Sequence, residues 1–239
     1  MIIWAKSSED FRCNLPSVLY RRFSKKEHAL SFINNGEIRF MNLLYYKALE
    51  DDDTRNDSLE GEFKQEFNTK GLQLYVNAAG HNFVLNDVVD MKIEQVLPDM
   101  DAYFISCYST QLHETQEKNY GEYLVTINNS AEFIKRFNNA QISQYIAWQE
   151  IIYYEHKDVA TPLKKEFMNS PLWARKRDNY KHDYEFRIAL LISNLNKAKA
   201  TLLKDKNVQN NMDKDNNIMK KLFWRANLGN LTDITTLIC

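Results

Sequence analysis

The chain has 239 residues, with 31 Lys and Arg against 32 Asp and Glu, so its formal net charge is -1. A charge this close to zero argues against a protein that binds nucleic acid through a global basic field, although it leaves room for a local basic groove. Hydrophobic residues make up 44% of the chain and charged residues 26%, which excludes wholesale disorder and allows a sizeable buried core.

The sequence lacks the motifs of several common sites. Cys13, Cys107 and Cys239 lie far apart with no C-x-x-C pair, so neither a zinc knuckle nor a disulfide framework is expected. There is no dinucleotide-binding G-x-G-x-x-G and no phosphate-binding loop, and the five histidines show no metal-ligand spacing. A signal-peptide core and a membrane-spanning apolar run are missing as well. We therefore expect a cytoplasmic protein with reduced thiols, no metal and no membrane association.

Apolar runs separated by turn residues predict the strands of the first half of the chain, at residues 18–23, 38–42, 72–76, 81–85, 101–108 and 122–127. A helix over residues 25–34 is expected between the first two strands, because Ser24 and Glu27 form a capping box and Gly36 provides a stop. The third and fourth strands are expected to form a hairpin. The acidic, turn-rich segment 50–62 is expected to be a loop.

The second half of the chain continues the irregular alternation. Strands are predicted at residues 145–154, 184–193 and 218–228, helices at 130–137, 161–176 and 194–206, and a polar loop at 207–217. Ser130 is the expected cap of the first of these helices, and Pro171 is a potential break in the second. This pattern predicts an α+β fold, with mixed but mostly antiparallel sheets and flanking helices, in a single domain over residues 1–239.

The first candidate site cluster is Tyr20-Arg21-Arg22, in the first strand. Alternate side chains of a strand face opposite sides, so we expect one arginine to point into a cleft and the other outward. The planar guanidinium of an arginine held on a strand can bind a diphosphate through two hydrogen bonds. The alternative is an edge strand that carries two solvated charges.

The second cluster is the polar end of the strand at 101–108, where Tyr108 is followed by Ser109 and Thr110. Hydroxyl groups at the end of a strand can orient a ribose or a catalytic carboxylate. They can equally be turn residues that hydrogen-bond to their own backbone.

The third cluster is Asp183, Glu185 and Arg187, spaced two residues apart at the start of the most hydrophobic strand. This spacing places all three side chains on one face, where buried charges are costly unless they are paired or functional. A surface salt bridge between Glu185 and Arg187 is the alternative, and we favour a functional cluster because the continuation is so apolar. His182 could transfer protons near neutral pH, although a structural hydrogen bond is the simpler role.

Taken in order, short blocks over about residues 18–192 resemble a large bacterial family whose function is unknown. The blocks are Tyr20-Arg21, Asn56-Asp57 with Glu60-Gly61, Cys107-Tyr108-Ser109, Trp173, and Asp183-x-Glu185-Phe186-Arg187. The chain departs from that family at residues 112–121, where many members carry Met-Trp-x-x-Tyr and only Tyr120-Gly121 is similar. It also departs at Asp183, where the family has Glu.

The same order of residues resembles the pattern of ADP-ribosyltransferases, which implies an ADP-ribosyltransferase-like fold and NAD as the substrate. In that pattern Glu185 bonds the ribose 2′-hydroxyl as the essential carboxylate, and Asp183 is the acid on the acceptor side. The resemblance implies the remaining cofactor-side residues as well: Arg21 or Arg22 as the pyrophosphate anchor, Ser109 and Thr110 as ribose supports, Tyr20 or Tyr108 stacked on nicotinamide, and Arg187 on the same face as Glu185.

The function implied by this resemblance is NAD-dependent ADP-ribosyl transfer to a protein or nucleic acid, or NAD hydrolysis, in a toxin or a phage-defence or counter-defence effector. A cognate antitoxin or regulator would then be a partner. One alternative is a non-catalytic module on the same fold that senses a ligand or binds a partner, because the Trp block is missing. Another is a nucleic-acid-acting effector such as a nuclease, in which basic and aromatic residues would hold a single strand. The residues behind this last idea are Lys164, Lys165, Arg175, Lys176, Arg177, Lys220, Lys221 and Arg225, with Trp173, Tyr180 and Trp224. Solvated helix faces explain most of them more simply.

Overall fold

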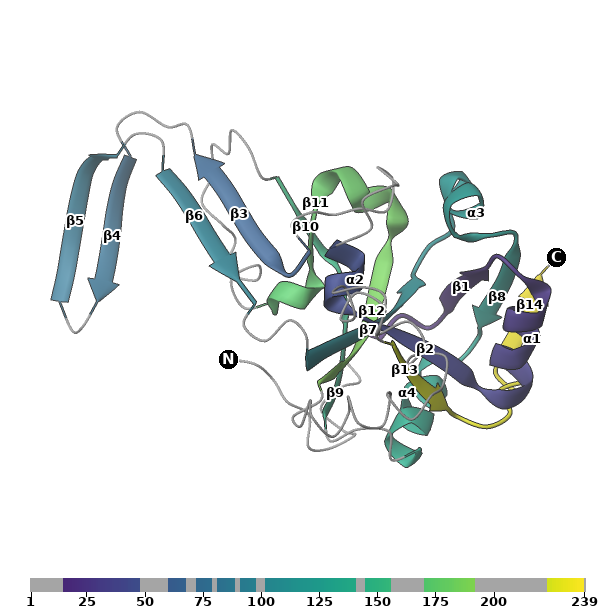
Figure 1. Cartoon of the computed structure of the whole chain (residues 1–239). Coiled ribbons are helices and arrows are strands. Elements are labelled where there is room, and N and C mark those ends of the chain that lie inside the picture. The colour runs from purple at the N-terminus through teal and green to yellow at the C-terminus, as the bar shows by residue number, and fades with distance from the viewer. Residues whose placement is uncertain are drawn as a thin grey trace, which may run out of the picture.

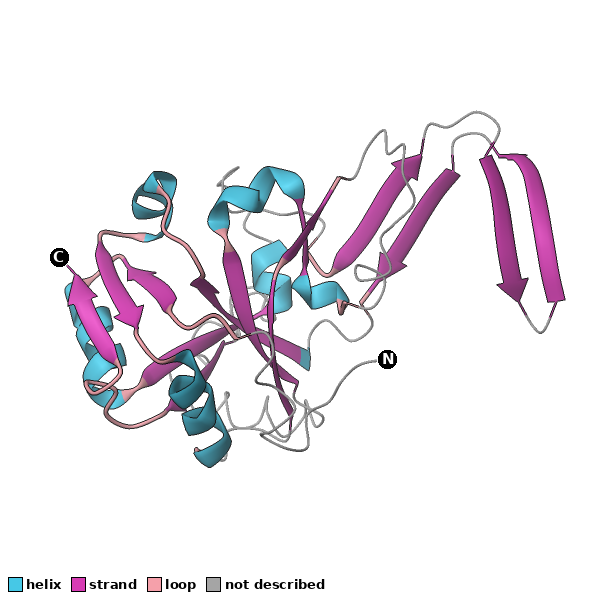
Figure 2. Ribbon diagram, turned by 180° about the vertical axis from the view of Figure 1, so that it is seen from behind, coloured by secondary structure: helices cyan, strands magenta, loops and turns pink. Residues whose placement is uncertain are grey.

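The computed structural model describes residues 15–47, 60–67, 72–78, 81–88, 91–97, 102–140, 145–155, 170–191 and 223–238. Its main element is one open antiparallel sheet of eight strands with helices packed on it (Figures 1 and 2). The predicted α+β class with mostly antiparallel pairing is confirmed. The helix expected at 194–206, the polar loop at 207–217 and most of the acidic loop fall outside the described residues.

The main sheet follows the order β13-β2-β7-β1-β8-β14, with β12 on the other edge of β7 and β9 beyond β12. Its strands are β1 (Leu19–Phe23), β2 (Glu37–Asn42), β7 (Tyr103–Ser109), β8 (Tyr123–Ile127), β9 (Tyr145–Glu150), β12 (Glu185–Leu191), β13 (Phe223–Asn227) and β14 (Thr235–Ile238). Every pairing within this sheet is antiparallel.

The sheet is split along one edge of β7. On the opposite edge β12 pairs with β7 over its whole length. On the split edge β2 pairs only with Phe104 and Ile105, whereas β1 reaches β7 through the single pair Tyr20 and Ser109. On this split edge, between the two contacts, no described strand pairs with Ser106 to Tyr108, because β1 and β2 diverge there. This split positions the pocket described below.

Helices α1 (Lys26–Asn35) and α4 (Ser130–Asn139) bury aromatic side chains against one face of the sheet. Phe32 of α1 and Phe133 of α4 lie in the same core cluster as Phe104 and Phe186, and their two rings are 6.0 Å apart. Because side chains alternate along β12, Glu185, Arg187 and Ala189 lie on the other face of the sheet. There Ala189 packs in a second hydrophobic cluster, which includes Trp173. The short helices α2 (Leu43–Lys47) and α3 (Glu114–Tyr120) complete the described helices.

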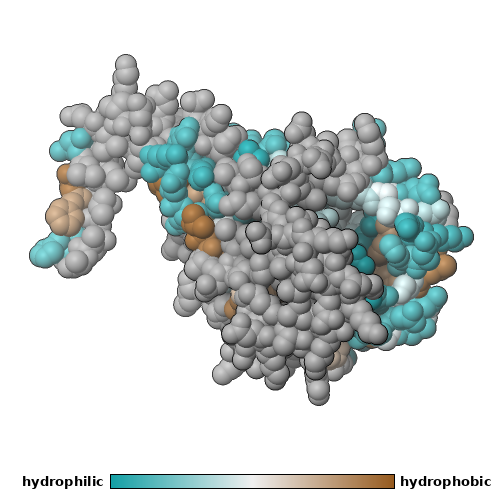
Figure 3. All heavy atoms as spheres, viewed as in Figure 1, coloured by the Kyte–Doolittle hydropathy of each residue, from teal (hydrophilic) through white to brown (hydrophobic). Residues whose placement is uncertain are grey.

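Three two-stranded sheets accompany the main sheet. They are β3 (Glu62–Phe67) with β6 (Met91–Val96), β4 (Leu72–Ala78) with β5 (His81–Val88), and β10 (Ile152–Tyr154) in parallel with β11 (Arg175–Arg177). The β3–β6 pair and, beyond it, the predicted β4–β5 hairpin extend away from the body to one side (Figure 1). Phe83, Val84 and Val96 of these arms are exposed apolar side chains. Figure 3 shows brown, hydrophobic atoms on both arms.

Several predicted boundaries are corrected by the structure. The strand expected at 145–154 is interrupted at Ile151, and its two halves join different sheets as β9 and β10. The Ile151 N–H still donates to the carbonyl of Glu185, which begins β12 of the main sheet. The end of the helix expected at 161–176 is instead the 3₁₀ turn η2 (Leu172–Ala174) followed by β11. Strands β3, β6 and β14 and helices α2 and α3 were not predicted.

The helix caps also differ in part from prediction. Gly36 ends α1 in the left-handed conformation as expected, but Lys25 rather than Ser24 is the N-cap and makes no side-chain capping bond. The N-cap of α4 is Asn129, whose side chain accepts a hydrogen bond from the Glu132 N–H at 3.0 Å. Ser130 is the first helical residue, and its hydroxyl donates to the carbonyl of Pro16. No helix among the described residues is long and apolar enough to cross a membrane.

Candidate functional site

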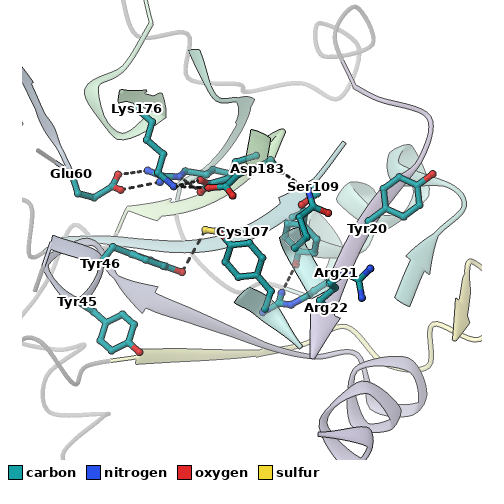
Figure 4. A pocket seen from close by; sticks show the side chains of 15 residues that line it. Tyr20, Arg21, Arg22, Tyr45, Tyr46, Glu60, Cys107, Ser109, Lys176 and Asp183 are labelled. Atoms are coloured by element: carbon teal, nitrogen blue, oxygen red, sulfur yellow. Dashed lines mark hydrogen bonds and ion pairs between the residues drawn. The ribbon is translucent and has the colours of Figure 1, made fainter. Parts of the chain in front are cut away.

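A pocket of about 240 Å³ lies at the split in the sheet (Figure 4). Its walls come from β1, β7, β11 and β12, from helices α2 and α3, and from the turns before β3 and β12. The lining residues are Tyr20, Arg21, Arg22, Tyr45, Tyr46, Glu60, Cys107, Tyr108, Ser109, Gln116, Tyr120, Lys176, Asp183, Glu185 and Arg187.

Eight of the nine site residues chosen from the sequence line this one pocket: Tyr20, Arg21, Arg22, Tyr108, Ser109, Asp183, Glu185 and Arg187. Thr110 is not among the described residues of the lining. Its hydroxyl lies 3.2 Å from both the Tyr184 carbonyl and Glu150 Oε1, and its N–H donates to the Tyr184 carbonyl. Thr110 therefore joins the end of β7 to the turn before β12, which differs from the expected role as a ribose support.

Arg187 is the centre of a buried ionic cluster in this pocket. It is only 1% exposed and is the largest fully buried side chain in the described structure. Its Nε–H donates to Glu185 Oε1 at 2.5 Å, and its Nη1 and Nη2 groups each donate to one oxygen of Glu60, the latter at 3.0 Å. Nη1 also donates to the Trp173 carbonyl at 2.7 Å. Arg187 thus ties the turn before β3, η2 and β12 together.

Lys176 supplies the second cation of the cluster. Its ammonium lies 3.0 Å from Glu185 Oε2 and 3.2 Å from Asp183 Oδ2. Each oxygen of Glu185 therefore faces one cation. Sequence reasoning assigned Arg175 and Lys176 to a solvated helix face, and the structure corrects this, because both are buried residues of β11.

The cluster holds its groups in defined charge states. Burial alone would raise the pKa of Glu185, but the charges of Arg187 and Lys176 outweigh it and hold that pKa well below its ordinary value. For Glu60 burial wins over the attraction of Arg187, so its pKa is raised. Burial opposes the charge of Lys176, yet Glu185 and Asp183 raise its pKa above the ordinary lysine value. Glu185 is therefore an anion and Lys176 an ammonium at neutral pH.

The acids are set apart by a strained turn. Tyr184, between them, adopts φ 47° and ψ 46°, and it is the only residue other than glycine with positive φ in the described part. Asp183 consequently ends the 3₁₀ helix η3 (Asp178–Asp183). It is not part of the strand, whereas the sequence had suggested that it shares one strand face with Glu185. Gln116 donates to the Asp183 carbonyl at 3.0 Å, and the Glu185 N–H donates to the Tyr153 hydroxyl at 2.9 Å.

One oxygen of Asp183 is left for the pocket. Asp183 Oδ1 is buried and has no hydrogen-bond partner among the described residues, although His182 Nε2 lies 3.6 Å away. A buried acceptor of this kind suits a hydroxyl or N–H donor of a bound molecule.

The two arginines of β1 differ in their surroundings, and both line the pocket, contrary to the expected one inward and one outward. Arg21 donates to Ser106 Oγ at 2.6 Å and to the Tyr108 hydroxyl at 2.9 Å, and its guanidinium lies 5.0 Å from the Tyr108 ring centroid. Arg22 donates to the Gly121 carbonyl at 3.2 Å, while its buried Nε–H has no partner in the described chain. Arg22 is therefore the better placed of the two to bind an anion.

The thiol of Cys107 is not an activated nucleophile. Burial, reinforced by the negative charge of Glu185, raises the pKa of Cys107 far above its ordinary value. The thiol lies 3.5 Å from the Tyr46 hydroxyl, whose pKa burial also raises. Within the described ranges no cluster of His, Cys, Asp and Glu has the arrangement of a metal site.

Searches among protein-family models, curated proteins and solved structures return no match to this chain. The geometry of the site therefore carries the functional argument.

Sequence reasoning missed the residues that complete the pocket. Glu60 belonged to the N-D-x-x-E-G block but received no role, and Lys176 was noted only as part of a basic run. Tyr46, Gln116 and Tyr120 come from short helices that the sequence pattern did not predict. The available signal was the resemblance itself, because the blocks containing Glu60, Ser109 and Glu185 lie far apart in the chain yet meet here.

Proposed function

We propose that this protein is an NAD-consuming ADP-ribosyltransferase on an ADP-ribosyltransferase-like fold. One observation carries the proposal: Arg22, Ser109, Asp183 and Glu185, from three distant segments, line a single pocket. Around them lie tyrosines that can stack on a planar ring.

The proposed reaction begins with the bond between nicotinamide and ribose C1′. Nicotinamide leaves with the bonding electron pair, and positive charge develops on the ribose. The Glu185 carboxylate, held ionised by Arg187 and Lys176, stabilises that charge more in the transition state than in the ground state. Arg22 binds the pyrophosphate through its unpartnered Nε–H.

The second half of the reaction uses Asp183. An acceptor nucleophile attacks C1′ from the opposite face, and its proton passes to the unpartnered oxygen of Asp183. When the acceptor is water, the same steps give NAD hydrolysis. We propose a protein or nucleic acid as the acceptor in transfer.

The size of the pocket fits part of the dinucleotide. Its volume of about 240 Å³ is slightly below the range of about 300–1,000 Å³ typical of small-molecule sites. We therefore place nicotinamide and its ribose inside, and the adenosine half at the mouth.

A direct test incubates the purified protein with NAD and measures nicotinamide release by chromatography. Glu185→Gln is expected to lower the rate about 100-fold or more, and Ser109→Ala about 10-fold. Thr110→Val is the matched control, because it removes the neighbouring hydroxyl, which bonds to Glu150 and the Tyr184 carbonyl and is not part of the described pocket lining. Circular dichroism of each variant checks folding. Lack of release by wild-type protein, with acceptors or with water, would contradict the proposal, as would full activity in a folded Glu185→Gln variant.

A second candidate is a ligand-sensing or partner-binding module without catalysis. It is favoured by the engagement of both Glu185 oxygens with Arg187 and Lys176, since a fully paired carboxylate is also what a structural ion cluster needs. NAD that raises the melting temperature without any nicotinamide release would favour this module over the enzyme.

The cellular role we propose is that of a toxin or phage-defence effector acting in the cytoplasm, where NAD is available, under the control of a cognate antitoxin or regulator. Induced expression in bacteria is then expected to lower cellular NAD or to modify a macromolecule. An unchanged NAD pool together with unmodified protein and nucleic acid would oppose this role.

A further inference from the structure

Lys176 reaches the pocket from outside the main sheet. It lies on β11, which pairs only with β10 in the described structure, and its neighbour in the register is Tyr153. Its ammonium nevertheless bridges the two acids of the site, at 3.2 Å from Asp183 and 3.0 Å from Glu185. The side chains of these acids are only 3% and 8% exposed, so water screens them little.

We infer that Lys176 is a positioning residue that bridges Asp183 and Glu185 and favours the charged form of the Glu185 carboxylate. Its effect on turnover rests on the proposed function, whereas its effect on the charge of Glu185 does not.

No other cation in the described cluster can take over this task. The guanidinium of Arg187 is committed to Glu60, to the Trp173 carbonyl and to Oε1 of Glu185. Near Asp183, the other candidate is His182 Nε2 at 3.6 Å, which is charged only when protonated. Without Lys176, no cation would bridge these two buried carboxylates, and the loss of its positive charge would disfavour the charged form of Glu185.

The charge balance explains why a lysine suits an enzyme of this proposed type. The cluster sets three carboxylates against two cations, so one formal negative charge is left for the developing positive ribose; its members are Glu60, Asp183 and Glu185 with Lys176 and Arg187. Without Lys176, the same cluster would set three carboxylates against the single guanidinium of Arg187, which disfavours the charged form of Glu185.

Lys176 itself does not act as a nucleophile in this scheme. Burial lowers its pKa, but Glu185 and Asp183 outweigh burial, so the amine stays protonated. The charged and titratable groups that face it come from four elements and one turn: Glu185 and Arg187 of β12, Asp183 and Tyr180 of η3, Tyr120 of α3, Tyr153 of β10, and Glu60 before β3.

The decisive variant is Lys176→Met, which keeps the length of the side chain and removes its charge. We would follow the Glu185 carboxylate by ¹³C NMR as pH changes, and expect its apparent pKa to rise by about one unit or more. Lys176→Arg should keep the low value. Lys181→Met is the matched control, because it removes an exposed charge from the same segment. An unchanged Glu185 titration in Lys176→Met would overturn the inference.

The effect on turnover is tested by the pH dependence of nicotinamide release. The acidic limb of kcat is expected to move to higher pH in Lys176→Met and to return in Lys176→Arg. A purely structural lysine would lower the melting temperature and the amount of active protein without moving this limb, and that result would refute the positioning role. Where Lys176→Met does not fold, Lys176→Gln replaces it, because the amide still donates to both acids without a charge.

These readouts separate the two proposals. If wild-type protein releases no nicotinamide, the proposed function fails, and the NMR titration still decides the role of Lys176. If the titration moves but the pH dependence of turnover does not, Lys176 controls the charge of Glu185 without serving the reaction, and the positioning role is refuted.

Discussion

Replacing Arg187 by methionine tests whether the ionic cluster holds the pocket together. The change removes four hydrogen bonds and leaves the carboxylates of Glu60 and Glu185, whose side chains are 2% and 8% exposed, without their shared cation. Breaking a buried pair in this way costs about 3–5 kcal/mol. At about 2–4 °C per kcal/mol for a chain of this size, the melting temperature should fall by about 6–20 °C.

Thermal and urea denaturation, followed by circular dichroism, measure this loss. Arg187→Lys should retain part of the stability because it keeps the charge. Adding Glu60→Gln to the Arg187→Met variant should recover about 1 kcal/mol or more, because it removes one of the unpaired buried charges. Lys92→Ala breaks an exposed pair with Glu94 and should leave the melting temperature nearly unchanged. A fall of less than about 3 °C in Arg187→Met, or strict additivity with Glu60→Gln, would show that the cluster is not the support we describe.

Further predictions concern the two carboxylates and the cap of α1. The pKa of Glu185 is held below its ordinary value of 4.5, so its ionised form stabilises the fold above that pH and loses this effect as the pH falls. The melting temperature of Glu185→Gln should therefore lie below that of wild type at about pH 5, and the difference should shrink towards about pH 3. Because burial raises the pKa of Glu60, its ionisation above about pH 4.5 costs stability, so the melting temperature of Glu60→Gln should rise relative to that of wild type as the pH increases. If the melting temperatures of the two variants changed with pH in the same way, both assignments would be contradicted. Gly36→Ala should cost more than about 1 kcal/mol in urea unfolding, because φ is 62° and the new Cβ would lie 2.4 Å from the Gly229 carbonyl oxygen. Gly229→Ala, at φ 76° with open space around it, should cost less, and equal losses would contradict the contact argument.

Strands buried on both faces could be predicted from the sequence. Residues 104–108 and 186–190 are mostly apolar, interrupted only by Ser106 and Arg187, because both faces of β7 and β12 are covered, and the structure pairs these two strands along their whole length. The hairpin of β4 and β5 was equally readable from its turn. The breaks within such strands could not be predicted. Ile151 carries no turn signal, yet the chain passes there from the main sheet, where its N–H bonds to the Glu185 carbonyl, to the pairing of β10 with β11.

The site could be predicted only in part, since its members meet through long-range pairing. The polar residues at the ends of β1, β7 and β12 were visible because they interrupt apolar strands. Lys176 was not, because nothing in a basic run shows that its middle residue is buried between two acids. The left-handed backbone at Tyr184 is also invisible in the sequence, since a tyrosine there gives no sign of positive φ.

The single contact between Tyr20 and Ser109 has a consequence for how this molecule can change. One wall of the pocket belongs to the paired strands β1, β8 and β14, and the opposite wall belongs to the paired strands β7, β12 and β9. Each set of paired strands has its own hydrogen bonds, so the width of the opening is set by the side chains between them, such as Tyr108 and Arg21, and not by strand register. Substitutions at those positions would alter which molecules enter while both sets of strands stay intact. Substitutions that change which ligand is bound can therefore accumulate in such a protein without a change in its fold.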